Sequence, residues 1–217
     1  MFTIAVANIK GGSGKSTVAT NLAAHFSLKG ERVVLGELDR QKTALSWLER
    51  RPKSAAPIAG VDLNKDDATL PPADILVVDA GAAMRRDAVK DVVMRADIIV
   101  VPVLPSIFDE DATRRFFDQL CTLKPIRKSK RDVAFVANRV KPRTKAAERL
   151  DGFLAELDFP AVAQLRDSQL YAHAALEGLS LFEMPLARAR SYIEEWWPLV
   201  TYIESSRLGM TKRKKPG

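Results

Sequence analysis

The chain has 217 residues, of which 47% are hydrophobic and 28% are charged, and its formal net charge at pH 7 is +7. This length fits one domain with a sizeable core, and no apolar run approaches the ~20 residues of a membrane-spanning helix. The single cysteine, Cys121, excludes a disulfide or a paired-cysteine metal site within one chain. The basic excess favours an anionic partner, either nucleic acid or an anionic membrane surface.

The first predicted elements are a strand and a helix joined by a glycine-rich stretch. Residues 2–8 form the apolar run of a buried strand, and residues 18–28 have the apolar spacing of a helix. Because the chain enters a strand at once, no secretory signal is visible, and we expect a cytoplasmic protein. The stretch between strand and helix reads Lys10-Gly11-Gly12-Ser13-Gly14-Lys15-Ser16-Thr17.

A glycine-rich turn between a strand and a helix predicts a phosphate-binding loop. Glycines let backbone N–H groups approach the phosphates, and the helix N-terminus adds a partial positive charge. In such a loop Lys15 reaches the β- and γ-phosphates, and the Ser16 hydroxyl ligates Mg²⁺. The usual pattern has a glycine where this chain has Ile9, so the stretch is a variant with a second lysine, Lys10, at its start.

Strand and helix patterns alternate along the remainder of the chain. Strands are expected at 32–38, 56–61, 74–79, 97–103, 133–138 and 161–165, and helices at 44–49, 88–95, 109–123, 144–157, 168–176 and 187–207. Pro198 should kink or divide the last helix. The patterns predict one α/β domain over residues 1–208, with a mostly parallel twisted sheet and helices on both faces. A flexible basic tail is expected at 209–217.

Three predicted strands end in polar residues that we treat as candidate site residues. Ligands in parallel sheets bind at the carboxyl ends of the strands. Asp39 directly follows the run at 32–38, and Asp79 and Asn138 are the last residues of the runs at 74–79 and 133–138. Asp79 comes directly after four apolar residues, and a buried carboxylate needs a cation or a donor as its partner. Each residue also has a purely structural interpretation: Asp39 as an aspartate in a turn, Asp79 as a capping aspartate and Asn138 as an asparagine before a loop.

The stretch from Lys10 to Thr17 resembles the deviant Walker A motif of the ParA/MinD ATPases, a family with the P-loop NTPase fold. The resemblance implies that the chain binds ATP and Mg²⁺ and that Lys15 is the P-loop lysine. It further implies a homodimer in the ATP state, in which Lys10 reaches across the seam to the phosphates of the other subunit.

Two further segments resemble the switches of that family. Glu37-Leu38-Asp39-Arg40-Gln41 is similar to the first switch, with Glu37 and Arg40 as departures, which makes Asp39 the catalytic aspartate that orients water near Mg²⁺. Asp79-Ala80-Gly81-Ala82 resembles a Walker B element and second switch, in which Asp79 holds Mg²⁺. By the same resemblance Asn138 contacts adenine.

The resemblance implies a slow, partner-stimulated ATP hydrolase. Its ATP dimer would bind nonspecific DNA of the nucleoid and position a cargo: a plasmid, a chromosome region or a protein organelle such as a carboxysome. A ParB-like or organelle-linked adaptor would stimulate hydrolysis. Candidate DNA contacts are Arg166, Arg188, Arg190, Arg207 and the tail residues Lys212, Arg213, Lys214 and Lys215, although a tail of this kind can also be a solvated terminus.

The main alternative is a MinD-like switch acting on a membrane surface. It needs an exposed apolar face formed by Ile193, Trp196, Trp197, Val200 and Ile203. Three glutamates in the same segment oppose anionic lipid, and the same residues also fit a closing helix packed on the sheet. A metabolic ligase or kinase on the same scaffold stays open, whereas cluster chemistry needs paired cysteines that the chain lacks.

Overall fold

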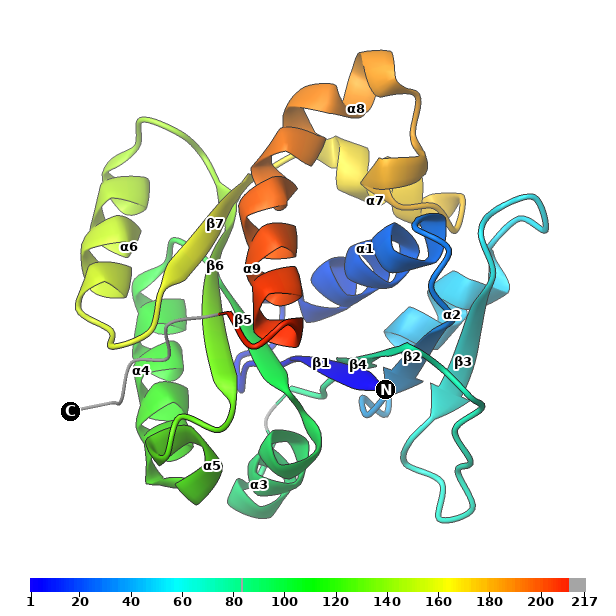
Figure 1. Cartoon of the computed structure of the whole chain (residues 1–217). Coiled ribbons are helices and arrows are strands. Elements are labelled where there is room, and N and C mark those ends of the chain that lie inside the picture. The colour runs from blue at the N-terminus through cyan, green and yellow to red at the C-terminus, as the bar shows by residue number, and fades with distance from the viewer. Residues whose placement is uncertain (83, 211–217) are drawn as a thin grey trace.

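The computed structural model describes residues 1–82 and 84–210 (Figure 1). Its centre is a seven-stranded sheet in the order β3-β2-β4-β1-β5-β6-β7, and every strand pairing among the described residues is parallel. The predicted α/β fold is therefore confirmed. The strands are β1 (Phe2–Val6), β2 (Val33–Glu37), β3 (Ile58–Asp62), β4 (Ile75–Asp79), β5 (Ile98–Val103), β6 (Asp132–Val140) and β7 (Ala161–Arg166).

Helices cover both faces of the sheet (Figure 1). Alternate side chains of β1 enter opposite layers: Ile4 and Val6 pack in the layer of α1, and Ala5 packs in the layer of α3 and α4. One layer holds α1 (Lys15–Leu28), α2 (Thr43–Glu49), α7 (Gln169–Leu176) and α9 (Trp197–Arg207), with α8 (Leu186–Ile193) packed beside α7. The other holds α3 (Arg86–Arg95), α4 (Ile107–Thr122), α5 (Lys124–Arg127) and α6 (Lys145–Ala155).

The predicted division of the last helix is confirmed, and two short elements differ from the sequence prediction. The segment at 187–207 is two helices, α8 and α9, separated by the 3-10 turn η2 (Glu194–Trp196). Pro198 lies in the first turn of α9, where a missing N–H costs no intrahelical hydrogen bond. The short helix α5 and the 3-10 turn η1 (Leu181–Glu183) were not predicted, because neither is long enough to show a helical period.

The apolar residues that a membrane-surface switch would need are largely buried. Side-chain packing leaves Ile193, Trp196, Val200 and Ile203 at most 9% exposed, while Trp197 is 45% exposed. The indole nitrogen of Trp196 also donates to the Tyr171 hydroxyl at 3.1 Å. Among the described residues, no helix has the length and apolar character to cross a bilayer. The segment is a closing helix packed on the sheet, as the second interpretation of its sequence proposed.

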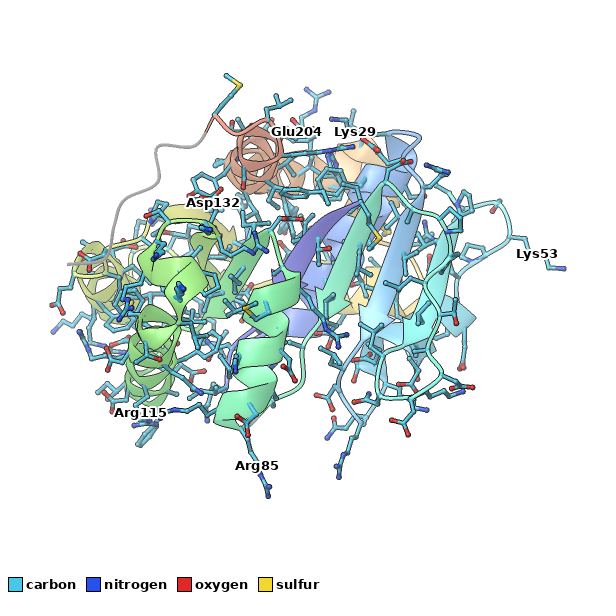
Figure 2. The ribbon with its side chains drawn as sticks, turned by 60° about the horizontal axis from the view of Figure 1, so that its bottom comes forward. Lys29, Lys53, Arg85, Arg115, Asp132 and Glu204 are labelled. Carbon is cyan, nitrogen blue, oxygen red and sulfur yellow. The ribbon has the colours of Figure 1, made fainter. Side chains whose placement is uncertain are left out.

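His25 on α1 is buried between aromatic rings in the same layer. Its ring lies 4.7 Å from that of Phe182 and 5.6 Å from that of Trp197, measured between centroids. The pKa of His25 is lowered to about 4, first by burial and second by the charge of Lys29, against an opposing effect of Glu204. Lys29 and Glu204 form an ion pair at the edge of this layer (Figure 2).

The buried histidine makes stability depend on pH. Because the unfolded chain has an ordinary histidine pKa near 6.5, it binds a proton between about pH 6.5 and pH 4 that the folded chain excludes. His25 alone should therefore lower the free energy of unfolding by about 1–2 kcal/mol as the pH drops from about 7 to 5. The buried Asp79, with its pKa raised to about 7, acts in the opposite direction over this range, so the histidine contribution is measured as the difference in urea unfolding between wild type and a His25 variant.

Two variants separate His25 from other titrating groups. Between about pH 7 and pH 5, His25→Leu should lose about 1–2 kcal/mol less of its free energy of unfolding than wild type does, because no proton is then excluded on folding at this position. His173→Leu is the matched control, since His173 lies at the surface beside Glu177 at 3.7 Å. An unchanged loss in His25→Leu would contradict this explanation.

Candidate nucleotide-binding site

The register of the sheet brings the three polar loops to one edge. Glu37 at the end of β2 pairs with Asp79 at the end of β4, and Asp79 in turn pairs with Val6 at the end of β1. The glycine-rich loop follows β1, the 38–41 turn follows β2, and the 80–82 turn follows β4. The sequence prediction that these segments share the carboxyl edge of the sheet is confirmed.

The start of the glycine-rich loop is fixed by Asn8, a residue the sequence analysis did not single out. Asn8 is fully buried. Its side-chain oxygen accepts a hydrogen bond from the Lys10 amide at 3.1 Å. Its nitrogen donates to the Pro102 carbonyl at 2.9 Å and to the Thr113 hydroxyl at 3.0 Å. The sequence feature that could have indicated this role is the position of Asn8, a polar residue at the end of an apolar strand.

The two lysines of the loop have different environments. Lys15 is buried, and its ammonium group donates to the Lys10 carbonyl at 3.0 Å. Burial lowers the pKa of Lys15, while Asp79 and then Asp39 raise it. The ammonium group of Lys10 forms no hydrogen bond or ion pair with any other described residue, and it is therefore free to contact a ligand or a second subunit.

Two glycines of the loop adopt left-handed backbone conformations. Gly12 has φ +77° and Gly14, which precedes α1, has φ +91°. The buried Asn138 donates from its amide nitrogen to the Ser13 carbonyl at 2.8 Å. Asn138 thus braces the loop in this structure, and its predicted contact with adenine stays a prediction. Ser16 and Thr17 lie in the first turn of α1, directly after Lys15.

Gly14→Ala should disable the loop more strongly than Gly12→Ala. A Cβ at residue 14 would lie 2.2 Å from the amide nitrogen of Asn138, whereas one at residue 12 meets nothing within 4 Å. Both variants carry the left-handed backbone strain of about 1–2 kcal/mol, and only Gly14→Ala adds the clash. We expect at least about tenfold weaker ATP binding for Gly14→Ala than for Gly12→Ala, measured by nucleotide titration. Equal affinities would contradict this geometry.

Asp79 has the environment of a cation ligand. It is 1% exposed, and neither carboxylate oxygen has a hydrogen-bond partner among the described residues. Burial raises the pKa of Asp79 to about 7, and nearby Glu37 adds to that rise, while Ser16 and Lys15 act against it. An unpartnered buried carboxylate next to the Ser16 hydroxyl fits Mg²⁺.

The described residues contain no group of three or more His, Cys, Asp or Glu side chains placed to hold a metal ion by themselves. Mg²⁺ commonly binds through one or two protein ligands and completes its shell with phosphate oxygens and water. Ser16 and Asp79 would therefore hold the ion together with a nucleotide, and the ion would neutralise phosphate charge.

Asp39 links the two switch turns, and Glu37 fixes the first of them. The Glu37 carboxylate accepts from the backbone N–H of Asp39 at 3.0 Å and of Ala44 at 2.8 Å. Asp39 accepts from the Gln41 N–H at 3.0 Å and from the Ala82 N–H at 3.4 Å. The first turn is therefore held by two carboxylates, a role for Glu37 that sequence reasoning missed.

The predicted DNA contacts are not equally available. Arg166 pairs with Glu195 and lies over the ring of Tyr192, and Arg207 pairs with Glu31 at 2.6 Å. Arg188 and Arg190 on α8 are exposed. The tail residues 212–215 lie outside the described residues. Arginines that already form ion pairs lose part of their attraction for phosphate, so Arg166 and Arg207 are weaker candidates than their sequence suggested.

The parallel sheet, the braced glycine loop and the buried Asp79 define a P-loop nucleotide-binding protein. A family profile described as "CobQ/CobB/MinD/ParA nucleotide binding domain" matches residues 4–181. The chain belongs to this family, and it is a ParA/MinD-type ATPase.

Curated relatives match along most of the chain. A maintenance of carboxysome distribution protein A from Halothiobacillus neapolitanus is 30% identical over 202 residues, which cover 89% of this chain and 92% of the relative. A protein of the same name from Gloeobacter kilaueensis is 33% identical over 199 residues, covering 86% and 87%.

Solved structures share the fold at low sequence identity. A putative plasmid partition protein from Borrelia burgdorferi, bound to AMPPNP, has a TM-score of 0.72 at 16% identity and covers 97% of this chain and 99% of its own. The ATP complex of a McdA variant from Cyanothece has a TM-score of 0.68 at 16% identity and covers 98% of each chain.

Proposed function

We propose that this chain is a positioning ATPase whose ATP-bound homodimer binds nonspecific DNA. An adaptor protein stimulates ATP hydrolysis, and hydrolysis releases the protein from the DNA. The observation that carries the proposal is the pairing of two lysines in one braced loop. Lys15 is buried within its own subunit, while the Lys10 ammonium has no partner among the described residues. A second copy facing the same nucleotide would receive Lys10.

The site favours slow hydrolysis in the absence of a partner. Phosphoryl transfer depends mainly on positioning and charge neutralisation, for which Lys15, Lys10 and Asp39 provide the groups. Asp39 also holds its turn by accepting a hydrogen bond from the Gln41 N–H. A water must therefore be placed largely by geometry, and an adaptor that tightens the two switch turns would accelerate the step.

The cargo we propose is a protein organelle of the carboxysome kind. Support comes from the two curated relatives, which are named for carboxysome distribution and which align with most of this chain. A likeness to a plasmid partition protein supports the fold rather than the cargo, because its identity is 16%. The adaptor would accordingly be linked to the organelle.

DNA binding in defined nucleotide states tests the proposed function. Wild type and Asp39→Ala are tested for binding to densely immobilised nonspecific duplex DNA in the absence of nucleotide, with ADP and with ATP, over a salt series of about 50–300 mM. We expect binding that requires ATP, persists in Asp39→Ala and weakens steeply with salt, since phosphate contacts release counterions. Lys10→Ala should lower DNA affinity to that of the nucleotide-free protein. Binding that is equal in all nucleotide states would contradict the proposal.

A further inference from the structure

The positive charge of this chain is concentrated in three short segments. Residues 124–131 carry five lysines and arginines without an acidic residue, and residues 139–145 and 212–215 carry four each. Together they exceed the net charge of +7, so the remainder of the chain is net negative. The segment at 139–145 spans the end of β6 at the nucleotide edge, and its Arg139 pairs with Asp167 at 3.3 Å. A search for the anion-binding surface begins with residues 124–131, which carry the most cations and include α5.

Four cations of this segment are exposed and form no ion pair with another described residue. Lys124, Arg127 and Lys128 are spaced i, i+3 and i+4 and therefore share one face of the α5 turn, while Ile126, on the other face, is fully buried. Lys130 follows two residues later and is also exposed. None of the four forms an ion pair with another described residue.

The neighbouring residues hold this surface in place. Arg131 lies within 3.9 Å of Asp97 and donates to the Met94 carbonyl at 3.4 Å, which ties the segment to the end of α3. Asp132, which begins β6, is buried and accepts a hydrogen bond from Ser206 on α9. Figure 2 shows Asp132 between α5 and the end of α9. The cations are thus mounted on packed elements rather than on a long loop.

The basic segment at 124–131 lies at the amino edge of the sheet. Lys130 and Arg131 line a surface hollow together with Met1, Arg207 and Gly209. This edge is opposite the nucleotide loops, which follow the carboxyl ends of β1, β2 and β4.

We propose that the surface formed by Lys124, Arg127, Lys128 and Lys130, the amino-edge surface, binds the phosphate backbone of duplex DNA. This inference rests on the proposed function and names the residues that contact the DNA. Cations on a rigid turn suit a sequence-independent phosphate contact. Duplex DNA is favoured over a lipid surface because the apolar side chain of the turn, Ile126, points into the core and offers nothing to insert into a bilayer.

The position of this surface explains how ATP can control DNA binding. Two copies joined at their nucleotide edges carry their amino-edge surfaces facing away from the seam, so dimerisation leaves each surface unchanged. ATP then acts through avidity, since a dimer holds two DNA segments where a monomer holds one. Dense DNA favours this arrangement, whereas a single short duplex gains little from it.

The test compares two variants that lose the same charge. One replaces the amino-edge surface: Lys124→Gln, Arg127→Gln, Lys128→Gln and Lys130→Gln. The control replaces four exposed cations elsewhere: Lys53→Gln, Lys65→Gln, Arg188→Gln and Arg190→Gln. Lys53 lies far from α5 (Figure 2), and Arg188 and Arg190 are the exposed candidates from the sequence. Both variants are made in the Asp39→Ala chain with ATP, and both are checked for nucleotide binding and thermal unfolding.

The amino-edge variant should bind DNA at least about tenfold more weakly than the control, and its salt dependence, the slope of log affinity against log salt, should be shallower by roughly 3. Equal affinity and slope in the two variants would overturn the inference. The inference would also be overturned if the amino-edge variant kept its DNA binding but lost binding to vesicles of phosphatidylserine and phosphatidylcholine. If the parent chain with ATP binds no DNA at all, the proposed function itself fails, which is a separate result.

Discussion

Replacing Asp39 by Ala is expected to lower ATP hydrolysis by at least about 100-fold while leaving ATP affinity within about threefold of that of wild type. Asp39 lies near Lys15 of the phosphate loop, but its hydrogen bonds hold the two switch turns rather than that loop: it accepts from the Gln41 N–H at 3.0 Å and from the Ala82 N–H at 3.4 Å. The loop should therefore still bind nucleotide when this carboxylate is absent. Single-turnover hydrolysis and nucleotide titration measure the two quantities.

Asp39→Asn separates the charge of the side chain from its structural role. Asparagine can accept the same backbone hydrogen bond and keep the turn, but it lacks the negative charge that orients the attacking water. We expect Asp39→Asn to hydrolyse ATP as slowly as Asp39→Ala. Hydrolysis near the wild-type rate in either variant would remove Asp39 from the reaction.

Lys15→Ala should have the larger effect on binding, with ATP affinity at least about 100-fold lower. The Lys15 ammonium is buried at the loop and lies near the carboxylates of Asp79 and Asp39. Without it, phosphate would meet two carboxylates and lose a charge-assisted hydrogen bond. Calorimetric titration with a non-hydrolysable ATP analogue measures the loss.

Lys53→Ala is the matched control for Lys15→Ala, because Lys53 is exposed and precedes the amino end of β3, whereas the phosphate loop follows the carboxyl end of β1. It should bind the analogue as wild type does. Binding by Lys15→Ala within about threefold of wild type would show that the loop does not hold the β- and γ-phosphates through this lysine.

The parts of the fold that the sequence predicted are those with a strong local signal. The buried strands β4 and β5 were evident from apolar runs without alternation, and the phosphate loop was evident from its glycines and lysines. The end of β6 was not: the strand continues to Val140, past the predicted end at Asn138, through a bulge in which Arg139 has φ +53°. A bulge depends on pairing with a neighbouring strand, which a local pattern does not contain.

The candidate site was predicted as a set of residues but not as a network. The sequence singled out Asp39 and Asp79, yet the Asn8 side chain that fixes the phosphate loop is held by Thr113, a residue 105 positions away. Likewise, the ion pair of Arg166 with Glu195 joins residues 29 positions apart. Which cations remain available to a partner is therefore a property of the folded surface rather than of the charge count.

The mass of the Asp39→Ala protein in solution, with and without ATP, tests the central claim most directly. Sedimentation velocity should show a monomer without nucleotide and a species of twice that mass with ATP. Adding Lys10→Ala should return the ATP-bound protein to the monomer, because the free Lys10 ammonium would no longer reach the nucleotide of the second copy. A monomer in every state, or a dimer that forms equally without ATP and without Lys10, would contradict the account.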